Sequence, residues 1–255
     1  MIKFSWKSKI YTLLSCLFFI IVWDIIAKKI NNNIFLPNIK EICSAIYEIS
    51  CRDKFLFNIV VSFERSIISF LVALILSVIL GMLSYMHPFF EYFIKPLNSF
   101  VKTIPTMVLV VLALVWCNKD YAPYIVGIGI TFPILYEGIR DNLKNADKKI
   151  LEMAKIYEIS TFDKIIRIYI PLIKIYLMSV FVSTLSLTFK VVIAGEVHGQ
   201  PKYGIGSQIQ IEKINFNTPA IFAWIVLIVI ISLFMELLKY ILIKRMYRCN
   251  DGNSN

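Results

Sequence analysis

The chain has 255 residues, of which 58% are hydrophobic and 17% are charged, and its formal net charge is +10. An ordinary soluble domain is about 45–50% apolar and about 25% charged, so a soluble core could not bury this much apolar surface. Because the basic residues cluster beside the apolar runs, they indicate membrane topology and argue against nucleic acid as a partner.

Six stretches are predicted to cross a membrane as helices, since a span needs about 20 apolar residues. They are Ile10–Ala27, Ile67–Met86, Pro105–Cys117, Tyr121–Tyr136, Tyr176–Ala194 and Pro219–Leu242. The third is short, and the fourth contains two prolines, which membrane helices tolerate because neighbouring helices satisfy the freed backbone groups. The sequence therefore predicts an all-α polytopic protein with about six transmembrane helices, surrounded by membrane lipid.

The distribution of basic residues predicts that both termini lie in the cytoplasm. With the N-terminus inside, the inner segments hold sixteen Lys and Arg residues and the outer segments nine, with Arg65 counted among the outer ones. Residues 1–9 are then a cytoplasmic N-terminus, 10–249 the membrane domain and 250–255 a disordered cytoplasmic tail. The segment 139–175 is cytoplasmic and carries half of the inner positive charge.

The outer loop 28–63 contains one predicted helix. Leu36-Pro37-Asn38 is typical of a helix start, and the isoleucines that follow recur at helical spacing, at positions 39, 42, 46 and 49. We expect this amphipathic helix to lie along the outer membrane surface.

The cytoplasmic segment 139–175 begins with a predicted amphipathic helix. Its apolar face is expected to contain Ile150, Leu151, Ala154 and Tyr157. Its polar side is expected to contain Lys148, Lys149, Glu152 and Lys155.

A second short helix is predicted to start at Ser160, because Ser160 followed three residues later by Asp163 resembles a capping box. Pro171 then either ends this helix or begins the next span as its first-turn proline. Between the two helices we expect a bend at residues 158–160.

The spacing of this segment resembles that of a known family. It reads Glu152-Met153-Ala154, three residues, Glu158, nine residues and Ile168-Tyr169-Ile170-Pro171. The pattern Glu-Ala-Ala, three residues, Gly, nine residues and Ile-x-Leu-Pro marks the membrane subunits of binding-protein-dependent ABC importers.

Further motifs resemble the branch of this family that imports nitrate, sulfonates, taurine or thiamine-precursor pyrimidines. In chain order they are Leu36-Pro37, Ser62-Phe63-Glu64-Arg65, Lys102-Thr103-Ile104-Pro105, Ala194-Gly195-Glu196 and Gly204-Ile205-Gly206. The resemblance covers nearly the whole chain and implies the type I importer fold. It also implies a homodimeric permease in a bacterial inner or plasma membrane, which moves a small anionic or heterocyclic solute by alternating access.

The resemblance implies that the first cytoplasmic helix is a coupling helix, which docks on a separate cytoplasmic ATPase. The residues carried over to this role are Glu152, Met153, Ala154, Glu158, Ser160 and Pro171. ATP and Mg²⁺ would bind to that ATPase and no cofactor to this chain, and an extracytoplasmic solute-binding protein would deliver the solute. The chain itself is then not an enzyme.

One position departs from the family pattern, because Glu158 stands where the family has glycine. Glycine ends a helix easily in a positive-φ conformation, which costs a residue with a Cβ roughly 1–2 kcal/mol. Either the first helix continues through Glu158, or the turn there differs from the glycine turn of the family.

The translocation path is expected to include Lys190, Glu196 and Pro105. Lys190 lies in an apolar run, in the helix that lines the path in the family. Its ammonium group could attract an anionic solute, pair with a nearby acid or extend to the membrane surface.

Two alternative functions are an ATP-independent channel and a membrane-embedded enzyme. An enzyme should show convergent titratable groups at membrane depth, and those of the spans are scattered. A phosphate loop is not expected, because Ile205 follows Gly204 where such a loop needs lysine. Nor is a metal site expected, because His87 and His198 fall on opposite sides of the membrane in this topology.

Overall fold

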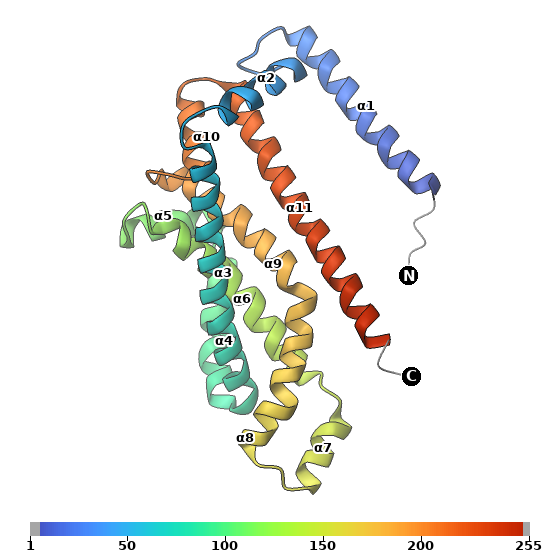
Figure 1. Ribbon diagram of the computed structural model, residues 1–255. Helices are drawn as coiled ribbons and strands as arrows, with labels where there is room; N and C mark the ends of the chain where they lie inside the picture. The colour runs from blue at the N-terminus through green and yellow to red at the C-terminus, as the bar shows by residue number, and fades with distance from the viewer. Residues whose placement is uncertain (1–5, 252–255) are drawn as a thin grey trace. The chain divides into compact units, whose positions relative to one another are not determined.

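The computed structural model describes residues 6–251, apart from the side chain of residue 148 and some side chains near the two ends (Figure 1). This part of the chain forms helices and no β-strand, which confirms the all-α prediction. In chain order they are α1 (Trp6–Ile30), α2 (Ile39–Ser50), α3 (Phe55–Met86), α4 (Pro88–Thr103), α5 (Thr106–Trp116), α6 (Ala122–Lys144), α7 (Lys148–Ile156), α8 (Thr161–Lys164), the π-helix η1 (Ile165–Tyr169), α9 (Ile170–Gly199), α10 (Ile205–Ile214) and α11 (Thr218–Asp251). Residues 1–5 and 252–255 lie outside the described part, so the expected segments 1–9 and 250–255 stay predictions.

Within the described residues, four helices are long and apolar enough to cross a membrane, or five if a bent pair counts as one span. The four are α3, α6, α11 and the continuous helix that α8, η1 and α9 form. The bent pair is α4 and α5, whose axes differ by 106°. The first expected span coincides with α1, where several side chains are outside the described part, so that span stays a prediction.

The expected span at Pro105–Cys117 is corrected by this bend. Helix α5 has 11 residues, which is about 16 Å at 1.5 Å per residue and roughly half of a bilayer core. It reaches sufficient length only together with α4, across the corner at Ile104 and Pro105. Proline at 105 disfavours helical backbone at the residue before it, and Ile104 is indeed extended, with ψ of 123°.

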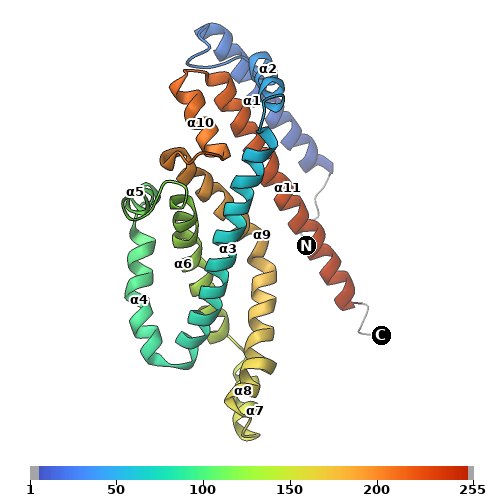
Figure 2. The same cartoon turned by 60° about the vertical axis from the view of Figure 1, so that its left-hand side comes forward.

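The chain divides into two compact units. Among the described residues, the larger unit contains 57–208 and 228–251, and the smaller one contains 6–56 and 209–227. In the larger unit, α6 lies beside α9 and also contacts α4 and α5 (Figure 2).

Helix α3 presents a buried face of small polar residues to the larger unit. Ser69 Oγ donates a hydrogen bond to the carbonyl oxygen of Tyr124 (3.2 Å), and Ser77 Oγ donates to that of Phe132 (3.1 Å). Small residues let helix backbones approach closely in a membrane, and hydroxyl groups bond across the interface. The serines thus hold α3 against α6 without leaving their own hydroxyls unsatisfied.

In the smaller unit, the helix predicted within residues 28–63 is confirmed as α2, and its place on the outer membrane surface stays a prediction. The backbone N–H of Asn38 donates to the Glu41 carboxylate (3.0 Å), so the helix begins at Ile39 with half of a capping box. The indole Nε1 of Trp23 donates to the carbonyl oxygen of Pro37 (3.1 Å), which ties the end of α1 to the start of α2.

Candidate functional site

The cytoplasmic segment predicted from the sequence folds into α7 and the helix that begins at Thr161. Ser160 caps that helix, because its Oγ accepts from the backbone N–H of Asp163 (3.1 Å) and donates to the Asp163 carboxylate (2.6 Å). The predicted cap at Ser160 is therefore confirmed. Asp147 caps α7 by accepting from the N–H of Lys149 (2.9 Å). The sequence signal for this second cap was Asp147 itself, because an Asp directly before a helix is a favoured N-cap residue.

The turn after α7 has a geometry that favours glycine. Glu158 adopts a left-handed conformation with φ of 49°. Its N–H donates to the carbonyl oxygen of Lys155 (3.0 Å), and the N–H of Ile159 donates to that of Ala154 (3.1 Å). These two bonds form a Schellman motif with Glu158 at the position that favours glycine. Both expected alternatives are therefore wrong: the helix does not continue through Glu158, and the turn does not differ from the glycine type, because Glu158 itself adopts the positive φ.

Replacing Glu158 by glycine should stabilise this turn. Removal of the Cβ relieves a strained left-handed residue, so we expect a gain of about 1 kcal/mol in the local opening free energy. Hydrogen exchange at the Ile159 amide measures it, with slower exchange expected in Glu158→Gly. Glu158→Ala is the matched control, since it removes the charge but keeps the Cβ. Equal exchange rates in the two variants would contradict this account.

The exposed surface of α7 is more apolar than the sequence pattern predicted. Ala154 is 1% exposed, whereas Met153, Ile156 and Tyr157 are 52%, 78% and 74% exposed. Tyr157 was expected on the inner face, but the helix ends at Ile156 and the turn directs Tyr157 outward. Ile150 is also exposed, at 40%. We call the exposed side chains of Met153, Ile156 and Tyr157 the α7 face.

The α7 face lies next to the charged residues predicted for the same role. Glu152 and Glu158 are exposed as well. Ala154, in contrast, is buried in its own chain in this conformation, so its contribution is to let α7 pack closely inside the molecule. The expected contact of Ala154 with a partner stays a prediction.

Pro171 does not end the second helix, which continues from Thr161 to Gly199. A proline in a helix lacks an N–H and its ring clashes with the carbonyl group four residues earlier. Here η1 precedes it, with the N–H of Ile170 donating to the carbonyl oxygen of Ile165, five residues back. This wider turn accommodates the ring, and Pro171 lies in the first turn of α9. The expected first-turn position of Pro171 is therefore confirmed, but Pro171 does not begin a separate span, because the helix is continuous from Thr161.

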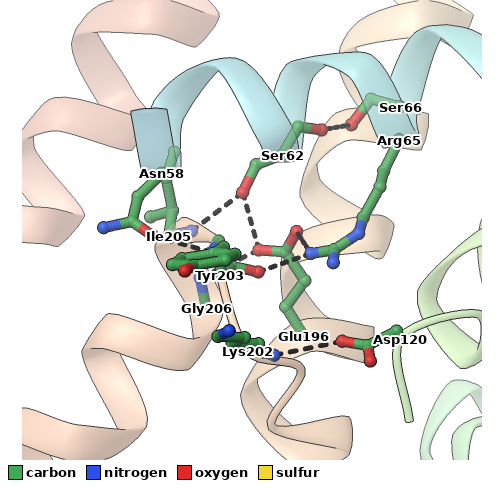
Figure 3. A network of polar contacts seen from close by, with 11 residues as sticks. Asn58, Ser62, Arg65, Ser66, Asp120, Glu196, Lys202, Tyr203, Ile205 and Gly206 are labelled. Atoms are coloured by element: carbon green, nitrogen blue, oxygen red, sulfur yellow. Dashed lines mark hydrogen bonds and ion pairs between the residues drawn. The ribbon is translucent and has the colours of Figure 1, made fainter. Parts of the chain in front are cut away.

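Glu196 is fully buried at the centre of a polar cluster (Figure 3). Arg65 Nη1 donates to Glu196 Oε1 (2.8 Å) and to the carbonyl oxygen of Tyr203 (2.7 Å). Ser62 Oγ donates to Glu196 Oε2 (2.7 Å), and the N–H of Gly206 donates to the same oxygen (3.0 Å). We call this cluster the Glu196 latch.

The Glu196 latch ties the loop between α9 and α10 to α3. The N–H of Ile205 donates to Ser62 Oγ (2.8 Å), and the N–H of Gly204 donates to Asn58 Oδ1 (3.0 Å). The carboxylate therefore lies at the amino end of α10, where a negative charge is favoured by the helix dipole. The ion pair also neutralises Arg65, which is otherwise a costly charge to bury.

The two glycines of Gly204-Ile205-Gly206 are required by the Glu196 latch. Gly204 has φ of +136°, and a Cβ there would lie 2.6 Å from the Glu196 carboxylate. A Cβ on Gly206 would lie 2.5 Å from Glu196 Cβ. Both positions therefore lack a side chain because Glu196 occupies that space.

Arg65 is the residue of this cluster that the sequence pattern placed wrongly. It was counted as an outer-loop charge, but α3 starts at Phe55 and Arg65 is only 5% exposed within it. A lone arginine inside an apolar helix was the available signal, since such charges are almost always paired.

The structure places the three predicted path residues in different environments. Glu196 is buried and bonded, Lys190 is exposed on α9, and Pro105 is exposed at the corner between α4 and α5. The Glu196 latch gives Glu196 a structural position in this conformation. Contact of any of the three with a solute stays a prediction.

A second polar cluster joins α4 to α6 and was not predicted. Glu137 accepts from Asn98 Nδ2 (2.8 Å) and from Lys102 Nζ (2.6 Å). Lys144 lies seven residues after Glu137 on α6 and forms an ion pair with Glu91 on α4. Glu137 thus fixes the last turn of α4, directly before the corner at Pro105. We call this contact the Glu137 clamp.

A metal site was not expected, and the described residues contain no group of three or more His, Cys, Asp and Glu side chains that could hold a metal ion. The charged side chains of the two clusters are instead paired with one another.

Comparison with known proteins agrees with this architecture. The family described as binding-protein-dependent transport system inner membrane component matches residues 73–248. A protein of Methanocaldococcus jannaschii named as an ABC transporter permease is 23% identical over 229 residues, which is 87% of this chain and 85% of that protein. Bacillus subtilis SsuC, named as an aliphatic sulfonates transport permease, is 21% identical over 216 residues, or 84% of this chain and 78% of SsuC. Because the family match covers well over half of the chain, this protein belongs to the inner-membrane components of binding-protein-dependent transport systems, and is an ABC importer permease.

Proposed function

We propose that two copies of this chain form the path by which a small anionic or heterocyclic solute is imported, driven by a separate ATPase. Family membership makes the chain a multi-pass, non-enzymatic transport subunit of the inner membrane. The proposal adds the dimer, the cytoplasmic location of both termini, the bacterial source, the ATPase that binds ATP and Mg²⁺, and the binding protein. The single observation that carries it is the exposed α7 face on an otherwise well-capped cytoplasmic loop.

The α7 face supports ATPase docking because exposed apolar side chains rimmed by charges are typical of protein interaction sites. Ile156 and Tyr157 expose most of their surface, and the Glu158 turn fixes their direction. Nucleotide on the ATPase would then favour one of two conformations through its different affinity for them.

The Glu137 clamp supports the idea that movement of this docking helix is transmitted to the membrane region. Helix α6 leads into α7 after three residues, and Glu137 on α6 holds Asn98 and Lys102 at the end of α4. A movement of α7 would therefore act on the corner between α4 and α5. Helices with ion pairs at their contacts can rearrange as rigid bodies, which alternating access requires.

The solute class is proposed from the motifs and from SsuC, whose name refers to aliphatic sulfonates. A sulfonate, nitrate, taurine or thiamine-precursor solute fits the branch that the chain resembles. Identifying the ATPase and the binding protein of this system, followed by a ligand screen on the binding protein, would determine the solute.

Uptake by reconstituted vesicles tests the proposal. Vesicles that contain this chain, its ATPase and its binding protein should accumulate radiolabelled ethanesulfonate or another solute found by the screen, only when ATP is present. Vesicles with this chain alone should accumulate none. Uptake by the chain alone would favour the ATP-independent channel and overturn the proposal, and conversion of the solute to a product would favour the enzyme.

A further inference from the structure

The amino-terminal part of the helix that α8, η1 and α9 form has an exposed side that combines basic and apolar side chains. The opposite side packs into the larger unit through Ile173, which is 3% exposed, and its partly buried neighbours. Arg167 and Lys174 lie on the exposed side, seven residues and therefore about two helical turns apart. Ile170 and Ile175 are exposed there as well, at 47% and 68%. We call these four exposed side chains the α9 basic face.

The length and the charge pattern of this helix put the α9 basic face at the boundary of its apolar part. The continuous helix has 39 residues, which is about 58 Å at 1.5 Å per residue, whereas a hydrocarbon core is about 30 Å thick. Part of the helix must therefore extend beyond the core. Residues 175–189, which follow Lys174 directly, contain no Asp, Glu, Lys or Arg. This uncharged run suits the hydrocarbon core, and the long side chain of Lys174 can then carry its charge to the headgroup region.

The two positive charges of the α9 basic face are available to an external anion. Within residues 6–251 as the structure describes them, no acidic side chain forms an ion pair with Lys174. Arg167 Nε lies 3.3 Å from Asp163 Oδ1, with side chains 78% and 44% exposed. An exposed pair of this kind is weak, and the guanidinium group has further N–H donors on its two Nη atoms. Both basic groups can therefore contact a negatively charged group outside the chain.

We propose that the α9 basic face binds an anionic phospholipid of the inner leaflet, with its headgroup between Arg167 and Lys174 and an acyl chain along Ile170 and Ile175. Basic residues directly beside a membrane span attract anionic lipids, and the exposed isoleucines suit the acyl chain. A second copy of this chain is a poorer occupant, because a two-fold contact at this face would bring like charges together. The inference rests on the proposed cytoplasmic location of this segment and goes beyond the proposed transport function, since it assigns a lipid preference to the chain.

Native mass spectrometry of the purified full-length chain tests the proposal. The chain is titrated with phosphatidylglycerol or with phosphatidylcholine of identical acyl chains, and the dissociation constant of the first bound lipid is measured for each. Both lipids contain a phosphate, but phosphatidylglycerol alone has a net negative charge. One basic residue beside an anionic headgroup strengthens binding about fivefold, so the two residues should favour phosphatidylglycerol by about 30-fold.

Removing the two charges provides the decisive comparison. Arg167→Gln combined with Lys174→Gln should abolish the preference for phosphatidylglycerol, and each single substitution should lower it about fivefold. Lys174→Arg keeps the charge and should retain the preference. Lys119→Gln combined with Lys213→Gln is the matched control. It removes the same net charge at two exposed lysines of the predicted outer loops and should leave the preference unchanged.

Three results would overturn the proposal. Equal affinity for the two lipids would show that the α9 basic face does not select a charged headgroup. A preference that survives the double substitution, or that the control substitutions lower equally, would place it elsewhere or assign it to net charge alone. Displacement of the lipid by an equal concentration of water-soluble glycerol 3-phosphate would indicate a site for a soluble phosphate. The titration needs neither ATPase nor solute, so failure here is distinguishable from failure of the vesicle uptake experiment.

Discussion

Glu196→Ala should destabilise this protein severely, because Glu196 is the acceptor at the centre of a buried polar cluster. The substitution removes the acceptor of Arg65, Ser62 and Gly206 and leaves the Arg65 guanidinium buried without a counter-charge. Breaking a buried ion pair in this way costs about 3–5 kcal/mol. For a chain of this size that corresponds to a fall in Tm on the order of 10 °C, which thermal unfolding in detergent measures.

An exposed ion pair provides the control for the Glu196 latch. Asp24 and Lys28 pair at 2.6 Å across one turn of α1, with side chains 33% and 70% exposed. Such pairs contribute roughly 0–1 kcal/mol, so Asp24→Asn should leave the Tm nearly unchanged.

A double variant separates the charge from the packing. Arg65→Met combined with Glu196→Gln removes both charges and should recover much of the stability lost in Glu196→Ala, because no unpaired charge then remains buried. If Glu196→Ala alone unfolds at the temperature of the unchanged chain, the latch does not hold the α9–α10 loop as described.

The helical architecture was predictable because long apolar runs dominate this sequence. The spans at α3, α6, α9 and α11 follow from composition alone. Composition does not reveal how far a helix extends past its apolar part, and α3 consequently starts twelve residues earlier than expected, at Phe55 instead of Ile67. That error moved Arg65 out of its helix and concealed its pairing with Glu196.

The cytoplasmic loop shows which local features sequence patterns can specify. The cap at Ser160 depends on residues three apart and was predicted correctly. The apolar face of α7 was not predicted correctly. Helical periodicity assumes that the helix continues through Tyr157, whereas α7 ends at Ile156. The Glu137 clamp joins residues 35 and 39 positions apart, and no local pattern indicates which helices will meet.

Substitution of single exposed side chains on the α7 face is expected to abolish transport. Ile156→Asp and Tyr157→Asp place a charge where an apolar partner surface is expected, while their high exposure means that folding is unaffected. Central contacts of an interface contribute about 2 kcal/mol or more each, so binding of the ATPase should weaken at least about 30-fold. Co-purification with the ATPase and ATP-driven uptake both measure this loss.

Glu152→Lys tests the charged rim of the same surface and should also abolish uptake, with membrane insertion intact. Phe35→Asp is the control for the two aspartate variants, because Phe35 is 75% exposed but lies in the loop predicted to face outward. It introduces the same charge at similar exposure and should leave ATPase binding unchanged. If the α7 variants retain the ATPase and normal uptake, the α7 face is an ordinary solvated surface, and docking must take place elsewhere on the cytoplasmic side.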